Sequence, residues 1–322
     1  MNTSPAPAPL ITENWFKKLT HRLRPFANVF AIANLVAQIG IIVTGGAVRL
    51  TGSGLGCSTW PMCEPGNFTP EFHAEMTYHP IIEFGNRTLT GVLGVIAVLL
   101  ILAVAFDSNR TPRIRRLVWW PLALIALQAV VGGITVLLDL HPAIVAIHMV
   151  ISVALVAISA LIQYRLSPKH RDPVNQLPRL IRGGSTFLFA WMVPIVALGV
   201  IVTGAGPHSG DTEVGYRFSV DPFDMARVHA MSVWVFCAAL IVGGILLLRY
   251  SKSATNPIPG SVSNGYWWVV AITVLQGALG YYQTFNDLPE LVVALHLLGI
   301  GLFTTVTTRL FLLTRESVPS TL

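Results

Sequence analysis

Charged residues are scarce in this chain. They make up 11% of its 322 residues, whereas a soluble globular protein carries about 25%. Apolar residues make up 53%, and the mean hydropathy is +0.65. These values exclude an ordinary soluble domain. They predict an all-α polytopic membrane protein, because a helix satisfies its backbone hydrogen bonds internally within lipid.

Cysteine is scarce as well, with only Cys57, Cys63 and Cys237 present. No Cys-x-x-Cys or Cys-x-x-Cys-His motif occurs, so the sequence supports neither a thioredoxin-like centre nor covalently attached c-type haem. Cys57 and Cys63 share one loop expected on the oxidising outer side, where a disulfide is our expectation and two free thiols are the alternative. Cys237 lies within a predicted helix and is expected to be inert packing.

The first 25 residues lack the apolar core of a secretory signal, so no cleavable signal is expected. Eight apolar segments follow, each close to the ~20 residues that a spanning helix needs. They are residues 26–48, 81–105, 117–138, 142–163, 183–204, 225–248, 266–284 and 290–312. We therefore expect eight transmembrane helices in two pseudo-symmetric four-helix bundles.

The expected domain organisation follows from these segments. The two halves are residues 26–163 and 183–312, joined by a basic cytoplasmic linker at 164–182 and flanked by tails at 1–25 and 313–322. With an even number of spans, the side that holds both termini carries 17 of the 21 Lys and Arg residues but only 4 of the 15 acids. The positive-inside rule makes that side cytoplasmic, in a bacterial plasma membrane. The net charge of +6 thus reflects topology in lipid and not a nucleic-acid partner.

An internal repeat relates the two halves. Residues 128–148 and 276–296 align without a gap, and each segment begins with Gln and ends with His. A second echo matches residues 40–45 with residues 199–204 at five of six positions. The chain is therefore interpreted as two related units.

Three of the nine histidines, His148, His229 and His296, fall inside predicted spans. The other six are expected in loops or basic segments: His21, His73, His79, His141, His170 and His208. An ionisable residue in lipid is a functional-site hypothesis by default, although a hydrogen bond to a neighbouring helix is the ordinary alternative. His229 and His296 are expected at similar depth, where two imidazoles can take both axial positions of one haem iron.

The first half is expected to be chemically different. It supplies His148, but Asn86 occupies the place that corresponds to His229. A neutral carboxamide is a poor haem ligand beside imidazole. The sequence therefore predicts one pocket closed by two histidines and one pocket with a single histidine, whose second face can stay open.

Each charged residue near the outer end of a predicted helix has two alternative roles. Glu83 shares a helix face with Arg87, so it is either a helix-terminus carboxylate paired with Arg87 or a carboxylate beside a haem, able to accept a proton or stabilise positive charge. Arg49, Arg87 and Arg227 are either clamps for haem propionates or topology anchors.

Taken together, the motifs resemble the heme A synthase family over nearly the whole chain. They are the run Val-Thr-Gly-Gly-x-Val-Arg-Leu-Thr-Gly-Ser-Gly-Leu at 43–55, the Cys-x5-Cys loop with Trp60-Pro61, Glu83-x-x-Asn86-Arg87, the two Gln-x3-Gly…His blocks and Arg227-x-His229. Many members of that family carry a second histidine where this chain has Asn86.

The resemblance implies oxidation of the C8 methyl of haem O to the formyl group of haem A. It implies haem b held by His229 and His296, and haem O as substrate near His148 and Glu83. The implied partners are haem O, membrane lipid, haem O synthase, terminal oxidase assembly and an unknown electron acceptor. A diheme b-type electron-transfer cytochrome and a haem carrier are the alternatives.

Overall fold

The computed structural model describes residues 11–71, 77–167, 177–208, 210–211, 216–251 and 258–315, and it describes no side chain before Trp15. His73, His170, residues 168–176 of the predicted linker and much of both predicted tails lie outside this part. Within it the chain forms α-helices, one 3-10 helix and a single isolated bridge between Glu64 and Asn67. The predicted all-α class is confirmed.

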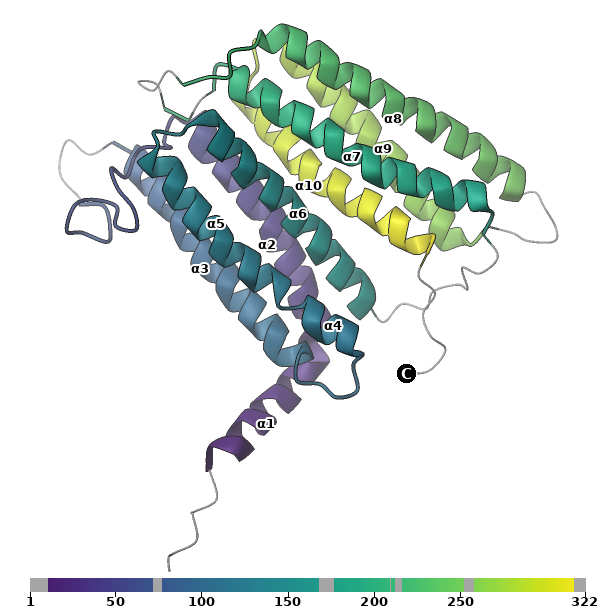
Figure 1. Cartoon of the computed structure of the whole chain (residues 1–322), viewed down its shortest axis with the longest axis horizontal. Coiled ribbons are helices and arrows are strands. Elements are labelled where there is room, and N and C mark those ends of the chain that lie inside the picture. Colours follow the sequence, from purple (N-terminus) through teal and green to yellow (C-terminus); the bar gives the residue numbers. More distant parts are fainter. Residues whose placement is uncertain are drawn as a thin grey trace, which may run out of the picture.

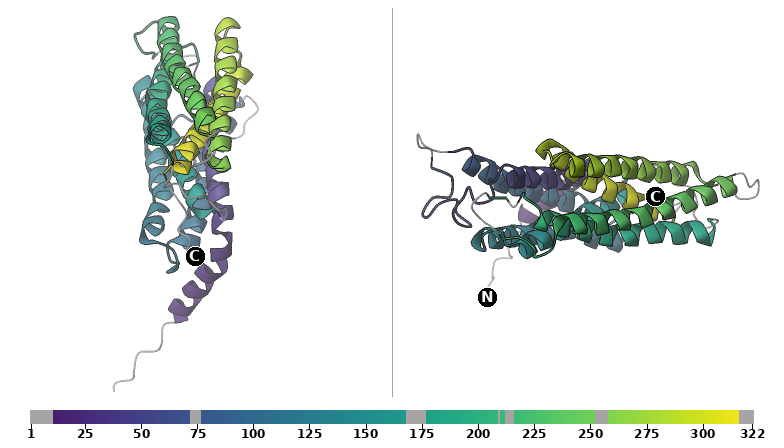
Figure 2. Two further views of the ribbon diagram at one scale, coloured as in Figure 1. Left: turned by 90° about the vertical axis from the view of Figure 1, so that its right-hand side faces the viewer. Right: turned by 90° about the horizontal axis from the view of Figure 1, so that it is seen from above.

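All eight predicted segments are helical, with ends within six residues of those expected. They are α2 (Ala27–Leu50), α3 (His79–Val104), α5 (Trp120–Leu137), α6 (Pro142–Leu166), α7 (Arg179–Ala205), α8 (Pro222–Ser251), α9 (Gly260–Phe285) and α10 (Glu290–Leu313). Three further elements were not expected: α1 (Ile11–Leu23), η1 (Arg24–Phe26) and α4 (Pro112–Leu117). Figure 2 shows α1 extending beyond the end of the bundle.

Seven stretches in the described part are long and apolar enough to cross a membrane. The first runs without interruption from Trp15 to Leu50, through η1. The exception is α9, whose first turns contain Gly260, Ser261, Ser263 and Asn264. Its 26 residues give it a length of about 39 Å, so it has the reach of a span without the apolar composition of one.

Prolines define several helix starts. They occupy the first or second position of α3, α4, α5 and α6, where the missing N–H costs nothing and the fixed φ suits a helix. The turns before α6 and α10 also share an unusual backbone. Asp139 and Leu140 have φ of 48° and 57°, and Asp287 and Leu288 have 54° and 55°. Positive φ is rare outside glycine, so its recurrence in both turns supports the sequence repeat.

The helices form two groups that lie side by side (Figure 1). Within the first group α2 packs against α3 and α6, and α5 packs against α3 and α6. Within the second group α10 packs against α9 and α7, and α8 packs against α7 and α9. The fully buried Phe236 lies in the large apolar cluster of the second group. Asn34 of α2 donates to Ser159 of α6 at 2.8 Å, a buried polar contact inside the first group.

α10 joins the two groups, because it contacts α2 and α6 as well as its own neighbours. Two glycines permit this close approach. A methyl group at Gly46 of α2 would overlap the side chain of Leu297, and one at Gly301 of α10 would lie 2.8 Å from Ile39. Small residues at such crossings let helices pack by shape in a lipid environment. Leu297 directly follows His296, so this crossing also fixes the helix that carries the histidine.

Candidate functional site

The three intramembrane histidines lie on α6, α8 and α10, and each faces a glycine of the neighbouring helix. A Cβ at Gly132 of α5 would lie 3.3 Å from Cε1 of His148. The corresponding distances are 3.2 Å from Gly199 of α7 to His229 and 3.6 Å from Gly280 of α9 to His296. Each imidazole therefore occupies space that a larger residue at the facing glycine position would fill. The same local arrangement occurs at all three histidines.

His229 is oriented by its backbone surroundings. Its Nδ1 lies 3.1 Å from the carbonyl oxygen of Ile195 on α7. A carbonyl oxygen only accepts, so Nδ1 carries the proton and the neutral ring presents an unprotonated Nε2. Ligating histidines commonly use this arrangement, in which one ring nitrogen donates to a carbonyl and the other binds the metal. His229 thus fits the role of an axial haem ligand.

His148 and His296 share a different support. The side-chain amide of Gln128 donates to the carbonyl oxygen of His148, and that of Gln276 donates to the carbonyl oxygen of His296, both at 3.0 Å. Gln128 also donates to Ser152 Oγ at 2.5 Å. Sequence comparison of the halves singled out both glutamines without assigning them a task. The structure shows that they tie the histidine-bearing helices to their neighbours.

The rings of His148 and His296 have buried Nδ1 atoms that find no hydrogen-bond partner among the described residues. Buried polar atoms are almost always satisfied, so these two rings differ from His229, whose Nδ1 is held by the Ile195 carbonyl. The described residues contain no cluster of three or more His, Cys, Asp or Glu side chains able to hold an ion. Haem iron takes at most two axial protein ligands, so pairs of side chains are the relevant sets.

The two groups offer different pairs. In the second group, α8 carries His229 and α10 carries His296. In the first group, Asn86 of α3 accepts a hydrogen bond from Thr44 Oγ1 of α2 at 2.8 Å through its Oδ1, and it is only partly buried. The side chain at the position matching His229 is therefore already held by its neighbour on α2.

The loop between α2 and α3 is closed by a disulfide between Cys57 and Cys63, both fully buried. The expected bridge is confirmed, and the alternative of two free thiols is wrong. Cys237 is free and partly buried within α8. The indole of Trp60, inside the closed loop, lies directly against Gly133 of α5. The loop thus reaches across to the helix whose Gly132 faces His148.

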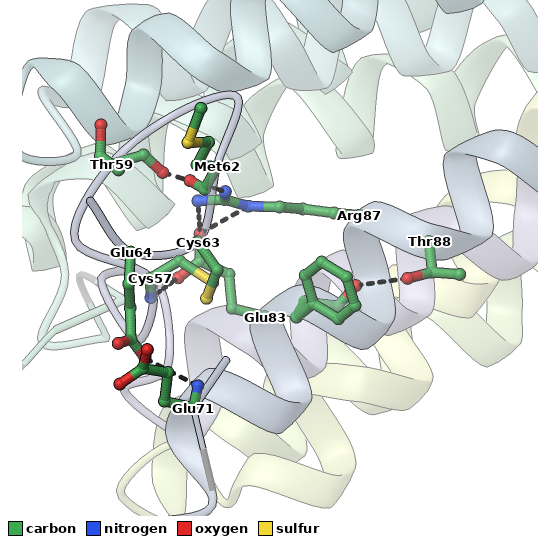
Figure 3. Close-up of a disulfide and its surroundings, with 10 residues drawn as sticks. Cys57, Thr59, Met62, Cys63, Glu64, Glu71, Glu83, Arg87 and Thr88 are labelled. Atoms are coloured by element: carbon green, nitrogen blue, oxygen red, sulfur yellow. Dashed lines mark hydrogen bonds and ion pairs between the residues drawn. A yellow bond between two sulfur atoms is a disulfide. The ribbon is translucent and has the colours of Figure 1, made fainter. Parts of the chain in front are cut away.

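Glu83 and Arg87 of α3 hold this loop in place (Figure 3). The Cys57 amide donates to Glu83 Oε2 at 2.6 Å, and Arg87 Nε donates to Glu83 Oε1 at 3.1 Å. Arg87 Nη1 donates to the carbonyl oxygens of Thr59 and Met62 at 3.0 and 3.2 Å. The predicted pairing of Glu83 with Arg87 is confirmed, and its contacts with the loop were not expected. Glu83 is 5% exposed.

The remaining two arginines differ from each other. Arg49, near the end of α2, donates to the carbonyl oxygens of His208 and, at 2.5 Å, Thr203, so it bridges the two helix groups. Arg227 on α8 is exposed, pairs with Asp224 at 3.2 Å and lies 4.5 Å above the ring of Phe223. The role of these residues as propionate clamps stays a prediction.

This geometry defines a class: an all-helical, polytopic membrane protein with candidate metal ligands inside its helices. Residues 28–216 match the COX15-CtaA family model, described as cytochrome oxidase assembly protein. Proteins named heme A synthase from Staphylococcus aureus strains MSSA476, JH9 and Newman are each 25% identical over 285 residues, covering 86% of this chain and 91% of theirs. The chain belongs to the COX15-CtaA family, as its motifs predicted.

Proposed function

We propose that this chain is a heme A synthase, a membrane oxidoreductase that converts the C8 methyl group of haem O to the formyl group of haem A. The family match and the name of the relatives support this activity. The observation that carries it is the difference between the two helix groups. The second group carries both His229 and His296, whereas the first group carries His148 and a hydrogen-bonded Asn86. A simple electron conduit needs no such difference.

The proposed conversion is a four-electron oxidation. The methyl group and one water molecule give the formyl group, four protons and four electrons, by way of hydroxymethyl and hydrated aldehyde stages, and an electron acceptor takes the electrons. Within the protein, His148 holds haem O and Glu83 stabilises positive charge or takes up a proton. Arg49, Arg87 and Arg227 are the candidate partners of the haem propionates.

His229 and His296 are the proposed axial ligands of a resident haem b. Bound there, the haem would supply a site for one-electron transfer. The protein's own contribution is orientation. The Ile195 carbonyl fixes the ring of His229 at 3.1 Å, and Gln276 anchors the His296 backbone at 3.0 Å. Gly199 and Gly280 leave room for both rings.

The proposed architecture is eight spans in two pseudo-symmetric bundles, residues 26–163 and 183–312, with both termini in the cytoplasm. The matched glutamine contacts and the matched positive-φ turns of the two halves support it. α9 completes the second bundle because it packs between α8 and α10. Its polar first turns then lie near the membrane surface and its later, more apolar turns within lipid.

Haem analysis tests the proposed activity. The full chain is expressed with and without a haem O synthase, purified, and its haems are extracted and identified by mass. We expect haem b in both preparations and haem A only with the haem O source. Haem b alone in both would favour a diheme cytochrome. Unaltered haem O as the only added species would favour a carrier.

Asn86→His tests the inequality of the two groups. It places an imidazole where the repeat puts His229, and imidazole outcompetes carboxamide for haem iron. We expect a new low-spin, bis-histidine signal from the first group in electron resonance. Asn86→Gln is the matched control, since it keeps a carboxamide and should add no such signal. Two bis-histidine haems of equal weight in the unmodified protein would contradict the inequality, and His79, at the first position of α3, would then be the candidate second ligand.

A further inference from the structure

A second candidate binding site lies far from the histidines, where α4 meets α5. It is an open groove of about 480 Å³, lined by Thr111, Pro112, Arg113, Arg116, Leu117 and Trp120. Figure 1 places α4 at the end of the first helix group opposite the disulfide-closed loop. None of the residues proposed above to hold haem contributes to it.

The groove carries two positive charges that the described structure does not neutralise. Arg113 and Arg116 are exposed and lie on one face of α4, three residues apart. Neither forms an ion pair with a described carboxylate. The nearest acid along the chain, Asp107, is instead held by Arg24 at 3.5 Å and by Arg110 at 3.6 Å. The charge of the groove therefore favours an anion as its occupant.

The lining of the groove also includes apolar and aromatic side chains. Leu117 and Trp120 line it, and Trp119 and Trp120 are 48% and 54% exposed. A candidate span begins at Pro112, so these tryptophans lie at the start of a membrane crossing. Tryptophan is enriched at this depth, where its ring meets the headgroup region. A small free anion makes no apolar contact with Leu117 and Trp120, whereas the glycerol and upper acyl carbons of a lipid can pack against them.

We propose that the groove at α4 and α5 binds the phosphate headgroup of an anionic phospholipid. Arg113 and Arg116 contact the phosphate, and Leu117 and Trp120 pack against the glycerol and the first acyl carbons. Basic pockets beside membrane-spanning helices recognise lipid headgroups in this way. The site is independent of the proposed haem chemistry, because it shares no residue with it.

Lipid titration tests this proposal. The delipidated full chain is titrated with phosphatidylglycerol or phosphatidylcholine, and bound lipid is counted by native mass spectrometry. We expect preferential retention of phosphatidylglycerol. Arg113→Gln and Arg116→Gln should each weaken it about fivefold, since each basic residue near the surface contributes about 1 kcal/mol. Arg249→Gln is the matched control: Arg249 is an exposed arginine in the last turn of α8, outside the groove, and should leave binding within about twofold.

Three outcomes would overturn the proposal. They are equal retention of the two lipids, an equal loss in Arg249→Gln, and displacement of phosphatidylglycerol by millimolar inorganic phosphate, which would identify a free-phosphate site. Trp120→Ala distinguishes a lipid site from a free-phosphate site. In a lipid site it should weaken retention of phosphatidylglycerol, because the aromatic contact is lost, and it should leave the effect of inorganic phosphate unchanged. Thermal unfolding without added lipid checks that every variant is folded. If a glutamine variant fails this check, Arg113→Lys and Arg116→Lys replace it, and we expect them to retain the lipid preference.

Discussion

His229→Ala and His296→Ala are each expected to remove the low-spin haem signal of the second helix group and to lower haem A formation more than about tenfold. Loss of a residue that only supports a metal ligand already costs about 10–100-fold, so loss of the ligand itself should cost at least as much. The measurement is the bis-imidazole electron-resonance signal of the purified protein, read beside the extracted haems. The glycines opposite both rings mean that alanine leaves an open space and causes no clash.

The chain supplies its own controls. His148→Ala should abolish haem A formation while the bis-imidazole signal of the second group stays, because His148 lies on α6 in the other group. His141→Ala should leave both readouts unchanged, since His141 is exposed at the N-cap of α6. An unchanged signal in His229→Ala or His296→Ala would contradict the ligand assignment. Loss of the signal in all four variants would point to a general folding defect.

Long apolar runs made most of the fold predictable from the sequence. Every predicted span is a helix, because its apolar length leaves few other ways to satisfy the backbone. α1 and α4 escaped prediction for the opposite reason. α1 is rich in charged and polar residues, and α4 has six residues, three of them arginine, so neither shows the apolar signal of a span. α9 differs from the other spans, because its helix is predictable from its apolar segment but its polar first turns weaken the signal of a membrane crossing.

The candidate site was partly predictable. The repeat identified His148, His296 and the two glutamines, because both halves retain them at the same offset, whereas His229 was predicted from its place inside a span. It did not indicate that Gln128 and Gln276 bond to the histidine backbones, which is a contact between helices. The contact of Glu83 with Cys57, 26 residues apart in sequence, also depends on how a loop folds over a helix. Nothing in the local sequence pattern encodes that path, and the same holds for Trp60 against Gly133.

Glu83→Gln is expected to leave haem bound but to stall oxidation, so that haem O or its hydroxymethyl product accumulates. The substitution keeps an oxygen that accepts from the Cys57 amide at nearly the same place, and it removes the negative charge. If that charge serves the substrate, product formation should fall at least about tenfold, or 1.4 kcal/mol in the barrier. The readouts are the ratio of extracted haems and the thermal midpoint of unfolding.

Arg87→Gln separates this role from that of a structural brace. Glu83 and Arg87 together hold the disulfide-closed loop, and breaking a largely buried ion pair costs about 3–5 kcal/mol of stability. If Glu83 has only a structural role, both variants should lose stability and haem A formation in parallel, because both release the same loop. A chemical role predicts that Glu83→Gln loses oxidation beyond what its loss of stability and of bound haem explains, while Arg87→Gln, which keeps the Glu83 charge, makes haem A in proportion to the haem O that it still binds.

The thiols of the loop provide a third, independent readout. In either variant the Cys57–Cys63 bridge should stay formed, so alkylation without reductant should label only Cys237. Protease cleavage within residues 58–62 then reports whether the loop has left α3. Faster cleavage in both variants together with equal losses of haem A would contradict a chemical role for Glu83. Slow cleavage in Glu83→Gln with oxidation stalled would support that role, because the loop would still be in place and only the charge beside the substrate would be missing.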